Sequence, residues 1–355
     1  MERLILFRGV GLVLFLLMTL EQIKYKYKKG YSIVGGILLT FLLGIRKNTP
    51  DLDIYEKLYL IKTSYAVEKG YLLLQDLFIF LKVNFNIFII ILGMITIFLM
   101  YRGFYYFTKY PNAAIFIYFS YYFLEKPYVQ VRNALSIAIF FNFLPFIVEN
   151  KKIKSIFGII LSGFFHITGY FYLAVLLLGR FKWTKIKIKL FYILILISGI
   201  FIYFFDITKI IIWISSFDLG RLSERIKVYF LSEEGKQYIR SASLGIRSLF
   251  SPLIYTIYTI KILYLQKFFQ NNLVKEKYIF ILLSLSLLFR VSSYKIIILG
   301  RVLGAFDFSE VLGLCLLLEV KQSKNILIYK IIYICLIGMY VFTSNYITGK
   351  NLNLW

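Results

Sequence analysis

The sequence contains a single histidine, His166, in the apolar stretch FFHITGY (164–170). An imidazole titrates at a pKa of about 6.5, so it can accept or donate a proton at neutral pH. Polar side chains within apolar, membrane-type sequence are costly and usually functional, although a neutral histidine hydrogen-bonded between helices is the simpler alternative. His166 is therefore a candidate general base or a candidate contact for an anion.

Arginine is the second residue type that could carry chemistry. A guanidinium binds phosphate in a bidentate way and stays charged when partly buried, whereas lysine suffices to orient a membrane protein. The chain has 12 arginines, and eight fall in segments that the threading below places outside the membrane: Arg46, Arg132, Arg221, Arg225, Arg240, Arg247, Arg290 and Arg301. Lipid headgroup contact or pairing with nearby acids could explain any one of them. For the set we favour an external anionic substrate held at headgroup depth.

Arg132 is the strongest of these candidates. It lies in EKPYVQVRNALSIAIFF (125–141), just after Pro127 and at the start of an apolar run. The free N–H groups and the dipole at a helix N-terminus favour an anion at the same place. Snorkelling to lipid headgroups is the alternative role.

Acids and tyrosines cluster in TPDLDIYEKLYLIKTSYA (49–66) and just beyond it. The apolar positions recur at helical spacing, with Pro50 at the start and acids in the first turn, which predicts an amphipathic helix on the outer leaflet. Asp51, Asp53 and Glu68 are candidate bases or hydrogen-bond acceptors beside His166, and Tyr55 and Tyr71 are candidate sugar-binding side chains. Charges that favour the helix dipole are the alternative role of the two aspartates. No other acids have metal-ligand spacing, so we expect neither an obligatory metal nor a cofactor.

The composition indicates what must position these residues. The chain is 60% hydrophobic and 19% aromatic, with a mean hydropathy of +0.76. Runs such as 85–101 are nearly uncharged and long enough to cross a hydrocarbon core of about 30 Å. The net charge of +24 lies between apolar runs rather than on one soluble face, which argues against nucleic acid as a partner and predicts a multi-pass membrane protein.

The four lysines within 24–29 are expected in the cytoplasm, which places the N-terminus outside. We expect an all-α protein with about ten full spans in a single domain, 1–355, with two large external segments at 46–83 and 207–245. The predicted spans are 4–20, 31–45, 84–101, 113–124, 131–148, 189–206, 246–263, 277–290, 302–320 and 326–344.

The segment 156–178 has basic residues on both sides, at 151–154 and 180–189. A single crossing would put one basic cluster outside, whereas a re-entrant hairpin that turns near His166 and Gly169 keeps both inside. Such non-helical backbone is tolerated where protein or a water-filled cavity surrounds it. We favour the hairpin over the single span.

Four stretches together resemble the EpsG family of bacterial polysaccharide polymerases, a branch of the Wzy-type O-antigen and capsule polymerases. They are GIRKNTPDLDIYEKLY (44–59), EKGYLLLQDLF (68–78), VRNALSIAIFF (131–141) and FFHITGYFYL (164–173), with a weaker likeness in GRVLGAFDF (300–308). This chain has Asn133 where the family pattern has Gln, and Thr168 and Gly169 where it has Ser and Ala.

The resemblance implies a membrane glycosyltransferase of GT-C-like architecture in the bacterial cytoplasmic membrane, with its active site facing outward. The implied substrate is an undecaprenyl-diphosphate-linked oligosaccharide, polymerised into O-antigen, capsule or exopolysaccharide, with a chain-length regulator and a flippase as possible partners. We expect Arg132, Arg46 and Arg301 at the leaving diphosphate and Arg221 and Arg225 as closing contacts from the large loop. His166 could take a proton or contact the phosphate.

Two other functions fit part of this pattern. A membrane O-acyltransferase could also use one histidine and arginines, but its donor would come from the cytoplasm or the membrane, against the external arginine bias. A lipid-linked oligosaccharide flippase should have internal repeats and polar groups throughout its spans. The sequence shows neither of these features.

Overall fold

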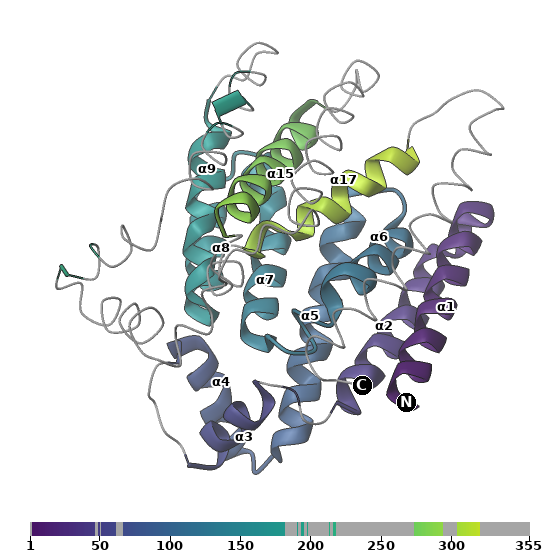
Figure 1. Ribbon diagram of the computed structural model, residues 1–355, viewed down its shortest axis with the longest axis vertical. Helices are drawn as coiled ribbons and strands as arrows, with labels where there is room; N and C mark the ends of the chain where they lie inside the picture. Colours follow the sequence, from purple (N-terminus) through teal and green to yellow (C-terminus); the bar gives the residue numbers. More distant parts are fainter. Residues whose placement is uncertain are drawn as a thin grey trace, which may run out of the picture. The chain divides into compact units, whose positions relative to one another are not determined.

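The computed structural model describes residues 2–46, 49, 51–61, 67–181, 273–293 and 304–319, with isolated positions between 190 and 217. Every regular element in these residues is helical (Figure 1). The α-helices are α1 (Glu2–Ile23), α2 (Lys28–Gly44), α3 (Leu52–Ile61), α4 (Lys69–Phe80), α5 (Phe85–Phe107), α6 (Pro111–Tyr118), α7 (Val131–Val148), α8 (Lys152–Phe165), α9 (Leu173–Gly179), α15 (Leu273–Ser293) and α17 (Phe308–Glu319). Short helical turns are η1 (Tyr25–Tyr27), η2 (Phe119–Phe123), η3 (Ile167–Tyr172) and η4 (Gly304–Phe306).

The chain divides into two compact units, which we describe separately. One comprises Met1–Leu176 and Glu310–Trp355, and the other comprises Leu177–Ser309. In the second unit Lys277 donates to the carbonyl of Gly179 at 2.5 Å, and Ser286 donates to Asp307 at 2.9 Å. The single domain over 1–355 that the sequence indicates stays a prediction.

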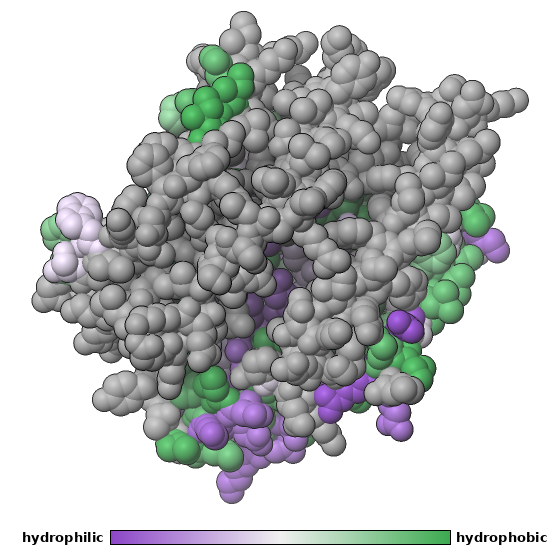
Figure 2. All heavy atoms as spheres, viewed as in Figure 1, coloured by the Kyte–Doolittle hydropathy of each residue, from purple (hydrophilic) through white to green (hydrophobic). Residues whose placement is uncertain are grey.

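Three helices among the described residues are long and apolar enough to cross a membrane: Glu2–Ile23, Phe85–Phe107 and Val131–Val148. They contain the predicted spans 4–20 and 131–148 and all of 84–101 except Asn84, which is the N-cap of α5, and they point to a membrane protein. Figure 2 shows mainly hydrophobic side chains along the visible side of α1, which suits a lipid-facing surface. Hydrophilic and hydrophobic side chains are mixed over α3 and α4.

Of the other predicted spans, some form one helix, some are divided between two elements and some lie outside the described residues. The 17-residue helix α2 covers 31–45 almost entirely. The span 113–124 is divided between α6 and the π-helical turn η2, and 277–290 lies within α15. The span 302–320 contains η4 and the 12-residue α17. The spans 189–206, 246–263 and 326–344 fall wholly or largely outside the described residues, so a total of ten spans stays a prediction.

Helix α7 is the centre of packing in the first unit. Its Phe141 ring contacts Phe104 and Phe107 of α5, at ring-centroid distances of 5.0 and 5.5 Å. Two reciprocal hydrogen bonds join it to α8, since Ser136 Oγ donates to the Ser162 carbonyl and Ser162 Oγ donates to the Ser136 carbonyl, both at 2.8 Å. Such bonds satisfy hydroxyls that would otherwise be buried without partners.

The chain reverses direction at His166, close to where the hairpin was predicted. His166 has extended backbone (φ −157°, ψ 135°) and ends α8. Gly169 then packs so closely on α8 that a Cβ atom would lie 2.3 Å from the backbone nitrogen of Gly163. Tyr172 stacks on Phe140, at 3.5 Å between centroids, further along α7. Helix α8 therefore runs back toward the N-terminal end of α7. The turn η3 then reverses the chain, so that it follows α7 in the opposite direction to α8.

The segment 46–83 contains α3 and α4, which lie near the N-terminal end of α7 and the C-terminal end of α8 (Figure 1). The predicted amphipathic helix is α3, with Tyr55 and Tyr59 buried and Leu60 and Ile61 exposed. Its buried tyrosines join Tyr71, Phe85 and Phe88 in one hydrophobic cluster. This packing holds the two short helices against the first turn of α7.

Candidate functional site

Arg132 lies in the first turn of α7 with its side chain 19% exposed. Its Nη1 donates to Glu68 Oε2 at 2.5 Å, and its guanidinium carbon lies 5.2 Å from the Tyr55 ring centroid and 5.7 Å from that of Tyr71. The Nε atom is buried and has no hydrogen-bond partner among the described residues. The Tyr55 hydroxyl and the Glu68 carboxylate both favour the charged form of this guanidinium.

Arg46 follows α2 and is more deeply buried, with 5% of its surface exposed. Its Nη1 donates to the carbonyls of Pro127 and Tyr128, at 2.9 and 3.3 Å, whereas Nε and Nη2 have no partner among the described residues. Burial lowers the pKa of Arg46 to about 10, with the hydroxyls of Tyr128, Tyr55 and Tyr71 opposing the shift. Arg46 therefore stays cationic at neutral pH.

Tyr55 and Tyr71 connect the two arginines. Their rings lie 5.8 Å apart, and they are 4% and 0% exposed. Burial raises the pKa of both phenols, so both remain neutral hydrogen-bond donors at physiological pH. The Tyr71 hydroxyl is buried without a partner in the described part of the chain. We call Arg46, Tyr55, Glu68, Tyr71 and Arg132 the arginine–tyrosine cluster.

Glu68 links this cluster to the segment that carries the histidine. It is the N-cap residue of α4, and besides pairing with Arg132 it accepts a long hydrogen bond of 3.4 Å from the backbone N–H of Ile167. Helix α4 comes this close because Gly70 has no side chain. A Cβ atom there would lie 2.7 Å from the carbonyl oxygen of Phe164. The structure thus brings Glu68 within reach of both Arg132 and the residue after His166.

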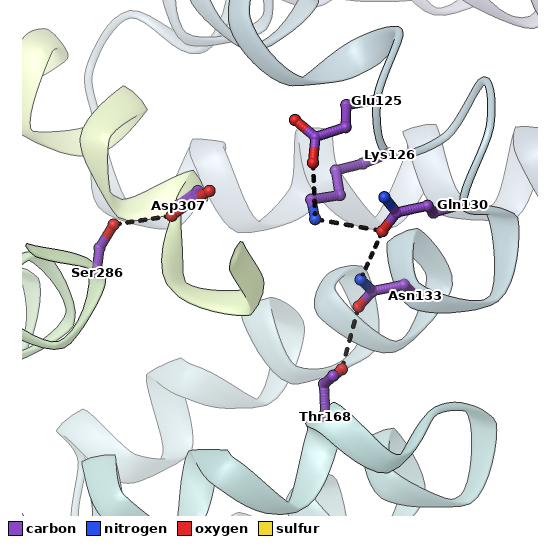
Figure 3. Close-up of polar contacts among 7 residues, drawn as sticks. All are labelled: Glu125, Lys126, Gln130, Asn133, Thr168, Ser286 and Asp307. Atoms are coloured by element: carbon purple, nitrogen blue, oxygen red, sulfur yellow. Dashed lines mark hydrogen bonds and ion pairs between the residues drawn. The ribbon is translucent and has the colours of Figure 1, made fainter. Parts of the chain in front are cut away.

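His166 is half-buried at the end of α8, and its Nδ1 lies 2.8 Å from Thr168 Oγ1. Thr168 in turn donates to Asn133 Oδ1 at 3.1 Å, next to Arg132 on α7. Figure 3 shows the contacts that continue from Thr168 and Asn133 to Gln130 and Lys126. Arg132 and Asn133 therefore face the cluster and the histidine respectively from a single helical turn.

This arrangement can bind an anion. Two cations and a tyrosine hydroxyl present donor atoms without partners in a buried setting, where electrostatic attraction is stronger than in water. A dipositive metal is a poor fit to these donors. Among the described residues no group of three histidine, cysteine, aspartate or glutamate side chains could hold a metal ion.

The remaining predicted site residues are not all part of this arrangement. Asp51 lies beside Tyr55 at the start of α3, whereas Asp53 is exposed in the first turn of that helix. The position of Asp53 suits a negative charge that stabilises the N-terminus of α3. Arg221, Arg225 and Arg301 lie outside the described residues.

A protein-family model matches residues 10–354, nearly the whole chain, and it is the model of the EpsG family. The chain belongs to the EpsG family. This confirms the resemblance seen in the sequence, and since EpsG proteins are polysaccharide polymerases it assigns the protein to glycan synthesis at a membrane. No curated protein and no solved structure matches the chain.

The EpsG match spans both compact units, whereas the four stretches that chiefly suggested it lie in the first unit. Two positions at which this EpsG protein departs from the family pattern, Asn133 and Thr168, are hydrogen-bonded to each other.

Sequence reasoning missed the role of Lys126 and Gln130. Lys126 is only 2% exposed and Gln130 only 7% exposed. The only signal in the sequence was a lysine beside Pro127 between two apolar runs. Their connection to His166 depends on Asn133 and Thr168, which are 35 residues apart.

Proposed function

We propose that this EpsG protein is a membrane glycosyltransferase that polymerises undecaprenyl-diphosphate-linked oligosaccharide units on the outer face of the bacterial cytoplasmic membrane. The product would be an O-antigen, a capsule or an exopolysaccharide. The observation that carries the proposal is the pair of buried arginines, Arg132 beside the rings of Tyr55 and Tyr71 and Arg46 held by the Pro127 and Tyr128 carbonyls, with donor atoms of both left without partners in the described structure. That arrangement matches the needs of a diphosphate leaving group.

In the proposed reaction, a hydroxyl oxygen of the acceptor unit bonds to the anomeric carbon of the first sugar of the growing chain. The bond from that carbon to the diphosphate oxygen breaks, and undecaprenyl diphosphate leaves with the bonding electrons. The two arginines stabilise the charge that develops on the diphosphate, because fixed donors act best where charge appears in the transition state. Tyr55 and Tyr71, whose rings lie beside Arg132, are the neutral donors of this arrangement.

The proton of the attacking hydroxyl goes to His166, which we assign as the general base. Glu68 supports this assignment, because it contacts both Arg132 and the backbone N–H of Ile167, the residue after the histidine. We place Asp51 near the sugar-binding tyrosines, and we keep Arg301, Arg221 and Arg225 as proposed contacts of the diphosphate and of the closing loop. The exposed side chain of Asp53 gives it a weaker claim to a catalytic role.

The distribution of positive charge supports an active site on the outer face of the membrane. Lysine-rich segments such as 24–29 and 151–154 are expected in the cytoplasm, and α3 and α4 follow α2 on the opposite side. A chain-length regulator and a flippase are the partners that such a reaction would use.

The test is to delete the gene in its host and to examine surface glycan by gel electrophoresis. We expect single repeat units in place of long polymer, restored by the wild-type gene. Arg132→Ala and His166→Ala, expressed at wild-type levels, should leave single units. Complete loss of surface glycan on deletion would favour a flippase, and long polymer in both variants would disprove the site.

A further inference from the structure

Helix α4 and its C-cap residue carry a row of apolar side chains on the side that faces away from the protein core. We call this row the α4 stripe, and its members are between 49% and 82% exposed: Leu73, Leu77, Phe80 and Leu81. At 3.6 residues per turn the stripe lies opposite Tyr71 and Gln75, which are buried. Apolar side chains on both sides of a helix indicate an apolar neighbour on each side.

The neighbouring helix α3 shows how a water-facing helix in this segment differs. Its exposed positions include three charged residues at helical spacing, Asp53, Glu56 and Lys57. Between Lys69 and Lys82, by contrast, Asp76 is the one charged residue. Contiguous large apolar side chains on a surface mark contact with a protein or with lipid.

The α4 stripe is continuous with the surface of a helix that is long and apolar enough to cross a membrane. Helices α4 and α5 each turn one side to the same hydrophobic cluster, in which the rings of Phe78 and Phe88 lie 5.1 Å apart. The sides turned away from this cluster are apolar in both helices, since the exposed residues of α5 include Ile87, Met94 and Phe98. The exposed side of a membrane-spanning helix faces acyl chains, and this continuity assigns the α4 stripe to the same environment.

The connection to α5 determines how deep α4 lies. Helix α5 begins shortly after α4 ends, and its N-cap Asn84 accepts a hydrogen bond from the Ile87 N–H at 2.9 Å. The 12 residues of α4 extend about 18 Å, which is short of a hydrocarbon core of about 30 Å. Lys69 and Lys82 are exposed at its two ends, where lysine side chains reach toward lipid headgroups. These features fit an interfacial helix at one end of α5.

We infer that α4 is an interfacial helix whose stripe contacts the acyl chains of the leaflet at the N-terminal end of α5. Helix α4 then separates lipid from the arginine–tyrosine cluster, because the ring of Tyr71 on its other side lies 5.7 Å from the Arg132 guanidinium carbon. One consequence rests on the proposed function: a lipid-linked donor brings its diphosphate to Arg132 past α4 while its lipid stays in the membrane. The lipid contact itself does not depend on that function.

Fluorescence quenching in vesicles tests the contact. Full-length protein with Cys315→Ala, Cys335→Ala and Leu77→Cys is labelled with a small fluorophore in detergent. It is then reconstituted into phosphatidylcholine–phosphatidylglycerol vesicles at a high lipid-to-protein ratio. The quenchers are nitroxides attached to the acyl chain, either near the headgroup or near the methyl end, and iodide on both sides of the membrane.

We expect the nitroxide near the headgroup to quench Leu77→Cys several-fold more than iodide does, and more than the nitroxide near the methyl end. Lys57→Cys on α3, in the same cysteine-free background, is the matched control and should be quenched mainly by iodide. Phe80→Cys repeats the measurement at the most exposed member of the stripe and decides the question if Leu77→Cys does not fold.

Three results would overturn the inference. Equal quenching of Leu77→Cys and Lys57→Cys by iodide would show that the stripe faces water. Protection from every quencher would show that protein, such as a second copy of the chain, covers it. Strongest quenching by the nitroxide near the methyl end would place α4 in the centre of the membrane instead of at its interface. None of these measurements uses polymer formation, so the inference and the proposed function can fail independently.

Discussion

At the scale of single residues, Arg132 interacts with an acid and two aromatic rings at once. Glu68 accepts one of its hydrogen bonds, and the rings of Tyr55 and Tyr71 lie beside its guanidinium. These contacts hold a long side chain in place before any substrate arrives, which lowers the conformational entropy lost on binding. We therefore expect binding of an anion to require the planar guanidinium with its paired N–H donors, and not only a positive charge.

Arg132→Lys tests that requirement. We expect lysine to keep the charge but to lose the paired donors and the stacking, so that polymer formation falls about tenfold or more, as the loss of a charge-assisted hydrogen bond worth ~1.5–3 kcal/mol would produce. The measurement is the amount of long polymer per unit of protein in the deletion strain. Arg102→Lys, at an exposed position on α5, is the control that should change little. Full activity in Arg132→Lys would contradict the bidentate role.

Substitutions at Asp53 and Glu68 should have different effects on polymer formation. Asp53→Asn is expected to leave polymer formation near wild type, because its side chain is exposed in the first turn of α3. Glu68→Gln removes the ion pair with Arg132 and should lower polymer formation about tenfold, which corresponds to ~1.4 kcal/mol. Loss of polymer in Asp53→Asn but not in Glu68→Gln would instead assign the role of general base to Asp53.

Sequence reasoning singled out Arg132 because an arginine at the start of an apolar run is unusual, whereas Tyr55 and Tyr71 were only candidates among 30 tyrosines. It could not find the residues that connect α7 to His166. Gln130 and Asn133 are common polar residues, and only the approach of Thr168 to α7 gives them a shared function. Such long-range contacts depend on how helices pack, which periodicity does not determine.

At the scale of elements, the reversal after α8 depends on Gly169. A Cβ atom there would lie 2.3 Å from Gly163 N and 2.4 Å from the Ser162 carbonyl carbon, and backbone atoms cannot move aside cheaply. We expect Gly169→Ala to destabilise the protein by about 1–3 kcal/mol. Thermal unfolding in detergent measures this, with Gly9→Ala as the control because its Cβ would meet nothing within 4 Å. Equal midpoints for both variants would refute the close packing.

The N-terminus of α6 is satisfied by a residue of another helix. Glu21 of α1 is fully buried and accepts hydrogen bonds from Asn112 N, Asn112 Nδ2 and Ala113 N, at distances between 2.8 and 3.3 Å. Glu21→Ala leaves these donors buried without that acceptor, so a loss of ~1–3 kcal/mol is expected for each unsatisfied group. The thermal midpoint should fall in Glu21→Ala but not in Glu2→Ala, an exposed acid at the start of the same helix.

Elements with strong local signals were predicted well. Tyr55 and Tyr59 recur at helical spacing and form the buried side of α3, and the chain does turn near His166. The division of 113–124 between α6 and η2 was not predicted, because a π-helical turn follows from tertiary packing around Phe119 and Phe123, both buried, and not from apolar content.

At the scale of the whole molecule, the sidedness of the two basic clusters decides how the chain crosses the membrane. In a variant with Cys315→Ala and Cys335→Ala, single cysteines at 151 and 185 should both be shielded from a membrane-impermeant thiol reagent in intact cells. We expect this because lysine-rich loops stay in the cytoplasm. Labelling of either position from outside would reject the hairpin and the outward site together.

The segment 124–130 supports both halves of the site. Its Pro127 and Tyr128 carbonyls hold Arg46, and its Lys126 begins the hydrogen bonds that reach His166. A shift of this segment would move the proposed diphosphate contact and the proposed base at the same time. The consequence expected from the proposed function is kinetic: binding of the lipid-linked donor at Arg46 would change the position of His166, so that proton transfer would be fast only when a chain is present to be transferred.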